Sequence, residues 1–102
     1  MSRKQFNLAR TALLDFITDL DDETLDFQAT PFNNTLRWHI GHVLVFTEKL
    51  LFGYPKKTKH IPENYATLFG PGTKPADWKD TPPSLAELTE YLLNQQERLN
   101  SF

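Results

Sequence analysis

The residues best suited to chemistry in this sequence are two histidines, His39 and His42, in the stretch NTLRWHIGH at residues 34–42. Neutral imidazoles are common ligands of zinc and related divalent metals. Two side chains three positions apart on a helix project about 60° from each other, so one metal ion could contact both. The spacing alone nevertheless favours a structural role. His39 lies nearer the middle of the larger apolar face, so we expect it to be packed and hydrogen-bonded in the core.

Other groups that would complete a catalytic site are missing from the sequence. The chain has no cysteine, which excludes disulfides, thiolate nucleophiles and cysteine-ligated zinc. His60 lies in the basic stretch PKKTKHIP and is expected to be solvated. Glu48 is six residues from His42 and points away from it, which excludes the Glu-x-x-His pair of carboxylate-bridged di-iron proteins. The sequence contains no HExxH motif, no glycine-rich phosphate loop and no nucleophile elbow.

Size and charge narrow the class of protein further. The 102 residues predict a single domain, residues 1–102, and the 11 basic and 13 acidic side chains give a net charge of −2. There is no basic stripe of the kind that neutralises phosphates, so nucleic acid is not an expected partner. The longest apolar run, residues 43–46, is too short to cross a membrane, and the N-terminus has no apolar secretory segment. We therefore expect a cytoplasmic protein without a membrane partner.

Apolar periodicity predicts three long helices that would position the histidines. The first covers about residues 2–20. The second begins after an N-cap at Asn33 or Asn34 and ends at Gly53. The third begins after Ser84, with Glu87 completing a capping box. The acidic stretch at 19–26 is interpreted as a solvated turn.

The long connection between the second and third of these helices, residues 54–83, is rich in proline and glycine. It predicts one short helix, which begins at Pro62 and ends at Gly70. A connection of this length usually covers a site or caps a core, and its aromatic residues favour capping.

The helix that carries the histidines is apolar on two nearly opposite sides. The larger stripe consists of Leu36, Ile40, Val43, Leu44, Phe46, Leu50 and Leu51, and the smaller of Trp38, Val45 and Phe52. The polar edge is left to Arg37, Gly41, Glu48 and Lys49. Such a helix fits between neighbours. Because only two other long helices are encoded here, we expect one apolar side to be uncovered and a homodimer to bury it.

The stretches PFNNTLRWHIGHVLVFTEKLLFG, LFGPGTKPADW and PPSLAELTEYL resemble the DinB/YfiT-like superfamily over most of the chain. The W-x-x-G-H motif of that superfamily is present as Trp38, Gly41 and His42. The resemblance implies an all-α, up-down helical bundle in which His42, and not His39, is one of three histidines that hold a divalent metal, commonly zinc or nickel. Family members supply the other two from a last long helix. This sequence has no H-x-x-x-H pair, so we expect that helix to be missing and the metal site to be incomplete.

The resemblance implies thiol-dependent transfer or metal-dependent hydrolysis of a small-molecule or thiol substrate, which requires an open coordination position on a three-ligand metal. Two hypotheses remain open. The chain is a DinB-like metal-dependent enzyme with an incomplete site that retains His42, or it is a non-catalytic helical interaction module with structural histidines. A metal shared between two chains, each providing His39 and His42, would combine the two.

Overall fold

The computed structural model describes residues 2–26, 35–54, 56, 60–79 and 81–101. Within these ranges the regular structure is helical: α1 (Arg3–Thr18), α2 (Asp22–Leu25), α3 (Leu36–Phe52), α4 (Asn64–Phe69), the short 3₁₀ helix η1 (Pro75–Asp77) and α5 (Leu85–Asn100). The predicted all-α bundle, with three long helices and a short helix in the long connection, is confirmed.

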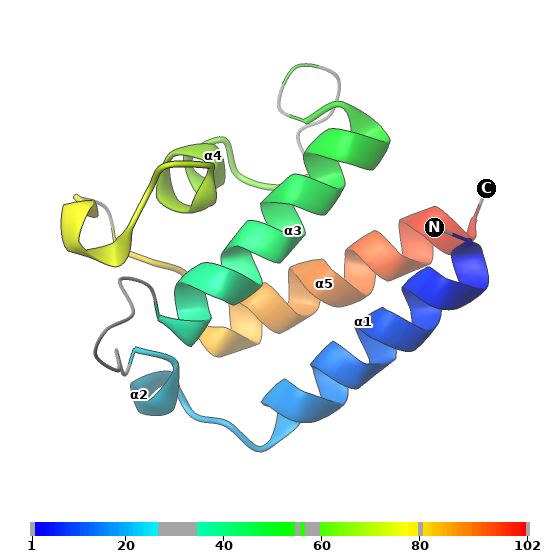
Figure 1. Cartoon of the computed structure of the whole chain (residues 1–102), viewed down its shortest axis with the longest axis horizontal. Coiled ribbons are helices and arrows are strands. Elements are labelled where there is room, and N and C mark those ends of the chain that lie inside the picture. The colour runs from blue at the N-terminus through cyan, green and yellow to red at the C-terminus, as the bar shows by residue number, and fades with distance from the viewer. Residues whose placement is uncertain (1, 27–34, 55, 57–59, 80, 102) are drawn as a thin grey trace.

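The three long helices lie side by side, with α5 between α1 and α3 (Figure 1). Helices α3 and α5 run in the same general direction and α1 runs the opposite way, so the two chain ends lie close together (Figure 1). Helix α4 packs across α3. No helix in the described ranges has the length and apolar character needed to span a bilayer.

The helix ends are set by local capping interactions. Ser84 accepts a hydrogen bond from the Glu87 amide, and Gly53 ends α3 in the left-handed region with φ 73°. The N-cap at Ser84 and the end at Gly53 match the prediction. The Glu87 half of the predicted capping box is not formed, because the Glu87 carboxylate accepts from the Tyr65 hydroxyl instead. Helix α3 begins after Thr35, whose side chain accepts from the Trp38 amide. The predicted caps Asn33 and Asn34 lie outside the described residues.

The acidic side chains at 19–26 are exposed, as predicted, but the stretch is more than a turn because it contains the helix α2. Asp21 caps α2, and the carboxylates of Asp22 and Asp26 lie 3.0 and 2.7 Å from the guanidinium of Arg37. Arg37 is only 3% exposed and also donates to the Pro83 carbonyl. A buried arginine is stable only when acceptors surround it, so these acids fix α2 against α3.

The long connection caps the core, as predicted. Tyr54, Ile61, Tyr65, Leu68 and Phe69 from this segment are buried in the same cluster as the core leucines of α3 and α5. The Tyr54 hydroxyl donates to the Pro62 carbonyl at 2.6 Å, and the Tyr65 hydroxyl donates to the Glu87 carboxylate. These contacts join the connection to itself and to α5.

The faces of α3 differ from the prediction on the polar side. Arg37, Gly41 and Glu48, expected at a polar edge, are all buried. Gly41 faces Phe69 so closely that a Cβ atom would overlap the aromatic ring. Trp38 and Val45 pack in the core, as expected for the smaller apolar stripe. Part of the larger stripe is uncovered in the described structure: Val43, Phe46, Leu50 and Leu51 are 41–70% exposed.

A buried polar network joins the three long helices. Arg10 of α1 donates to the Leu92 carbonyl at 2.9 Å and to the Gln95 side-chain oxygen at 2.8 Å. Gln95 in turn donates to Glu48 at 2.9 Å, and Arg98 donates to both oxygens of Glu48 at 2.7 Å. Burial lowers the pKa of Arg10 to about 10. The network explains why Glu48 sits inside the bundle.

Candidate functional site around His42

His42 projects from the middle of α3 towards α4 and is held by a backbone carbonyl. Its Nδ1 lies 2.7 Å from the oxygen of Phe69, the last residue of α4. A carbonyl oxygen only accepts hydrogen bonds, so the contact assigns the proton to Nδ1 when the ring is neutral. The lone pair of a neutral His42 is then on Nε2, on the other side of the ring.

The plane of the His42 ring is set by Trp38, one turn earlier on α3. The two rings are stacked, with centroids 4.6 Å apart and an interplanar angle of 10°. The Trp38 indole Nε1–H donates to Thr73 Oγ1 at 2.8 Å, and Thr73 Oγ1 donates to the Gly70 carbonyl at 2.6 Å. The segment from Phe69, the last residue of α4, to Thr73 therefore contacts both aromatic rings of the motif.

A groove of about 300 Å³ lies beside His42. It is lined by His42, Val45, Phe46, Lys49, Leu50 and Pro71. The lining is apolar apart from His42 and Lys49. A small ligand with an apolar body and an anionic group suits these walls, because Lys49 supplies the positive charge.

The other two histidines do not join His42. His39 is exposed, so its predicted place in the core is wrong. It lies on the uncovered side of α3 and contacts Trp38 edge-on, with ring centroids 5.2 Å apart. His60 is exposed, as predicted, and lines a different hollow with residues of α5.

The donor set in the described residues fits one ligand position and not a complete metal site. No group of three His, Cys, Asp or Glu side chains in these ranges could hold a metal ion.

Sequence reasoning missed two groups at this site: the Phe69 carbonyl, which is bonded to His42, and the Thr73 hydroxyl, which is bonded to Trp38. The role of the Phe69 carbonyl could not be predicted from residue types, because every residue has a backbone carbonyl. Thr73 follows Gly72, which has φ 83°. This Pro-Gly-Thr turn was the one available signal that the chain reverses there and returns to α3.

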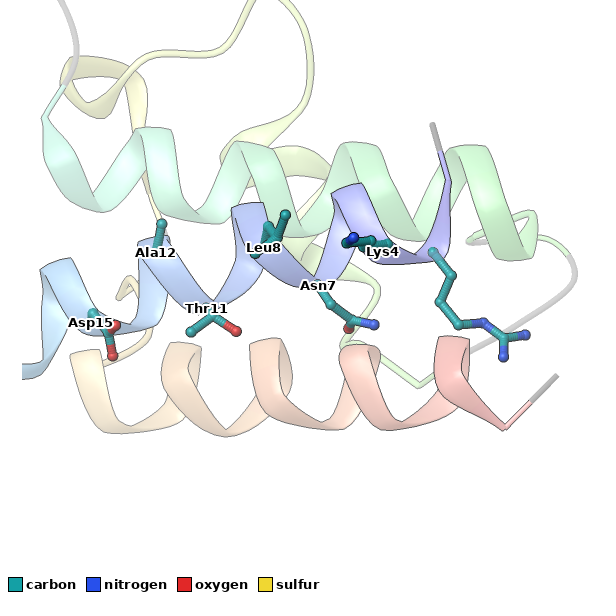
Figure 2. Close-up of a pocket in the computed structure, with 7 residues that line it drawn as sticks. Lys4, Asn7, Leu8, Thr11, Ala12 and Asp15 are labelled. Atoms are coloured by element: carbon teal, nitrogen blue, oxygen red, sulfur yellow. The ribbon is translucent and has the colours of Figure 1, made fainter.

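A second hollow runs along the outer surface of α1 and carries no comparable chemistry. Figure 2 shows its lining, which comes from α1 alone and is drawn with Lys4, Asn7, Leu8, Thr11, Ala12 and Asp15. Asn7 is already bonded to Asn100 and Gln96 of α5. The hollow is the exposed face of one helix, without a convergent set of polar groups.

A comparison with protein-family models places the chain among known proteins. A family model described as DinB superfamily matches residues 5–102. No curated protein matches the chain.

Proposed function

The chain belongs to the DinB superfamily, and from that membership we propose that it binds a divalent cation, zinc or nickel, with His42 as one imidazole ligand. The observation that carries the proposal is the hydrogen bond between His42 Nδ1 and the Phe69 carbonyl. Metal-binding histidines usually donate their second ring N–H to a carbonyl or carboxylate, which fixes the tautomer and aims the free nitrogen at the metal.

The surroundings of His42 support the same role. The ring is half-buried and stacked on Trp38, so its orientation is restricted before any ligand arrives. The groove beside it gives space for a small substrate whose anionic group would lie near Lys49. The superfamily membership favours thiol-dependent transfer or hydrolysis as the reaction class. When bound, the metal would supply Lewis acidity for that reaction.

The other ligands have to come from groups outside the described residues. Among the described residues, no group of three potential ligands includes His42. The protein is therefore expected to bind metal weakly by itself, or strongly only when another segment or another copy completes the site.

Calorimetric titration with Zn²⁺ and Ni²⁺ tests the assignment. His42→Ala should weaken binding about tenfold or more, because an oriented ligand is lost. His39→Ala is the matched control, since His39 is an exposed histidine on the same helix, and it should leave binding unchanged. Stoichiometric binding of unchanged affinity in His42→Ala would refute the assignment.

A second candidate function, a self-association module, is favoured by the uncovered strip on α3. Its residues are Val43, Phe46, Leu50 and Leu51. They expose an apolar area on the order of a few hundred Å², as large as the largest patch on a typical monomer. A standard interface buries about 800 Å² per partner, so the strip would form the centre of one. A second copy is the fitting occupant, because a two-fold axis places the same apolar strip on both sides.

Light scattering over the micromolar range tests self-association. Phe46→Lys should convert a dimer into a monomer, because it places a charge in the strip. Leu8→Lys is the matched control: Leu8 is 64% exposed on α1, and this variant should remain a dimer. A wild-type protein that is monomeric throughout this range would exclude the module.

A further inference from the structure

The segment from Phe69, the last residue of α4, to Thr73 contacts the His42 motif at two points. The first point is the Phe69 carbonyl, 2.7 Å from His42 Nδ1. The second is Thr73 Oγ1, which accepts the indole N–H of Trp38 at 2.8 Å. A single short segment therefore fixes one edge of the imidazole and also the ring on which the imidazole stacks.

We propose that Thr73 is a positioning residue for His42. By holding the indole of Trp38, it fixes the plane of the His42 ring and keeps His42 in the tautomer with a proton on Nδ1 and a free lone pair on Nε2. The importance of this role for metal binding rests on the proposed function, but the positioning itself exists in the metal-free protein.

The direction of each hydrogen bond supports a specific role for the Thr73 hydroxyl. Its single proton is donated to the Gly70 carbonyl at 2.6 Å, so the oxygen presents lone pairs to the Trp38 N–H. The Thr73 amide donates to the same carbonyl at 3.2 Å. The hydroxyl is thereby locked as an acceptor for the indole, because its donor capacity is already used.

The two restraints on His42 act on different degrees of freedom. The ring torsion of a histidine is broad, so an exposed imidazole normally samples a wide range of orientations. The stack on Trp38, with its 10° interplanar angle, selects the plane of the ring. The Phe69 carbonyl then selects which nitrogen faces α4. Loss of the indole anchor leaves the carbonyl alone, and we expect the ring to rotate away from it.

The segment itself is well anchored, so it can act as a fixed reference. The Phe69 ring is fully buried against Gly41 of α3 and is in edge contact with Trp78. The Trp78 indole donates to the Leu68 carbonyl at 2.8 Å. Thr73 therefore holds the Trp38 indole against a segment that is itself fixed by packing.

Nitrogen NMR of the imidazole in the metal-free protein tests the proposal. At about pH 8 an ordinary histidine is neutral, so its two ¹⁵N shifts report the tautomer. Wild-type His42 should be predominantly protonated on Nδ1. Thr73→Val, which removes the hydroxyl at nearly constant shape, should move both shifts towards those of a tautomer mixture. Thr73→Ser restores the hydroxyl and should restore the wild-type spectrum.

Two further variants separate positioning from general loss of structure. Trp38→Phe retains a ring for stacking but removes the N–H, so it should change the His42 shifts in the same way as Thr73→Val. Thr18→Val is the matched control, because the Thr18 hydroxyl is bonded only to the Leu14 carbonyl of its own helix, α1. Helix α1 contributes no residue to the site around His42. It should leave the His42 shifts unchanged. Far-UV circular dichroism, which reports helix content, should remain similar in all variants.

The result that overturns the proposal is an unchanged His42 tautomer in both Thr73→Val and Trp38→Phe. A second arm measures Zn²⁺ affinity, which should fall about tenfold in Thr73→Val and recover in Thr73→Ser. If the wild-type protein binds no Zn²⁺, the proposed function fails. The tautomer measurement still decides the positioning role of Thr73.

Discussion

Replacing Glu48 with alanine should lower the free energy of unfolding by about 3–5 kcal/mol, the usual consequence of removing one member of a buried ion pair. The Glu48 side chain is 0% exposed. Its carboxylate accepts a hydrogen bond from Gln95 at 2.9 Å and two from Arg98 at 2.7 Å. The substitution would leave the Arg98 guanidinium without its carboxylate in a site where it is only 17% exposed.

The size of the expected loss follows from the burial. An ion pair on the surface contributes at most about 1 kcal/mol, because water competes for both groups. Here water cannot replace the lost acceptor without entering the bundle, and a cavity adds to the loss. A domain of this length has a total stability of about 5–15 kcal/mol, so the variant would be close to unfolding. The midpoint temperature should fall by about 12 °C or more.

Urea denaturation followed by far-UV circular dichroism measures the effect. Glu97→Ala is the matched control, because Glu97 is an exposed glutamate on α5. It should change stability by less than about 0.5 kcal/mol. In Glu48→Ala with Arg98→Ala, the loss should be smaller than the sum of the two single losses, since the unpaired charge is removed. A loss below about 1 kcal/mol in Glu48→Ala would refute the reasoning that burial makes this pair essential.

Three further predictions test the packing and the titrating groups. Gly41→Ala should destabilise the protein in urea denaturation, because overlap with Phe69 costs about 1–3 kcal/mol, more than the ~1 kcal/mol gained from helix propensity. A net gain would show that the ring can move aside. The pKa of Asp22 is lowered chiefly by the amide of Leu85, so its stabilisation is present above about pH 4 and is lost as pH falls through the folded-state pKa. Asp22→Asn should therefore be less stable than wild type at pH 7 and approach it in acid; a constant difference across the range would contradict this. Burial raises the pKa of Tyr65, so in an alkaline absorbance titration this tyrosine should ionise only when the protein unfolds, and Tyr65→Phe should reduce the amplitude of that late step, to which the buried Tyr54 also contributes.

Tertiary contacts determine which charged residues of α3 are buried. A helical wheel places Arg37 and Glu48 on a polar edge, and by composition alone such residues belong in water. Their burial depends on partners from distant segments: Asp22 and Asp26 for Arg37, and Arg98 for Glu48. A helical wheel describes one helix and contains no information on the charged partners that neighbouring segments supply.

The candidate site likewise has one part that the local sequence predicts and another that depends on distant segments. The sequence located His42, because the W-x-x-G-H motif lies within one stretch of α3. The groups that orient its ring come from farther away: Phe69 is 27 residues from His42, and Thr73 is 35 residues from Trp38. The prediction for His39 failed because the apolar stripe beside it is uncovered in the described structure.

The sequence by itself determined the positions of the three long helices, including the N-cap at Ser84 and the end at Gly53, and it identified the histidines as candidate metal ligands. Ser84 and Gly53 act on backbone groups within a few residues, so their effects are readable locally. The tertiary structure alone decided which charges are buried, which apolar side of α3 is covered, and which nitrogen of His42 is free. These properties depend on atoms brought together by folding from segments far apart in the chain, and no local pattern encodes their distances.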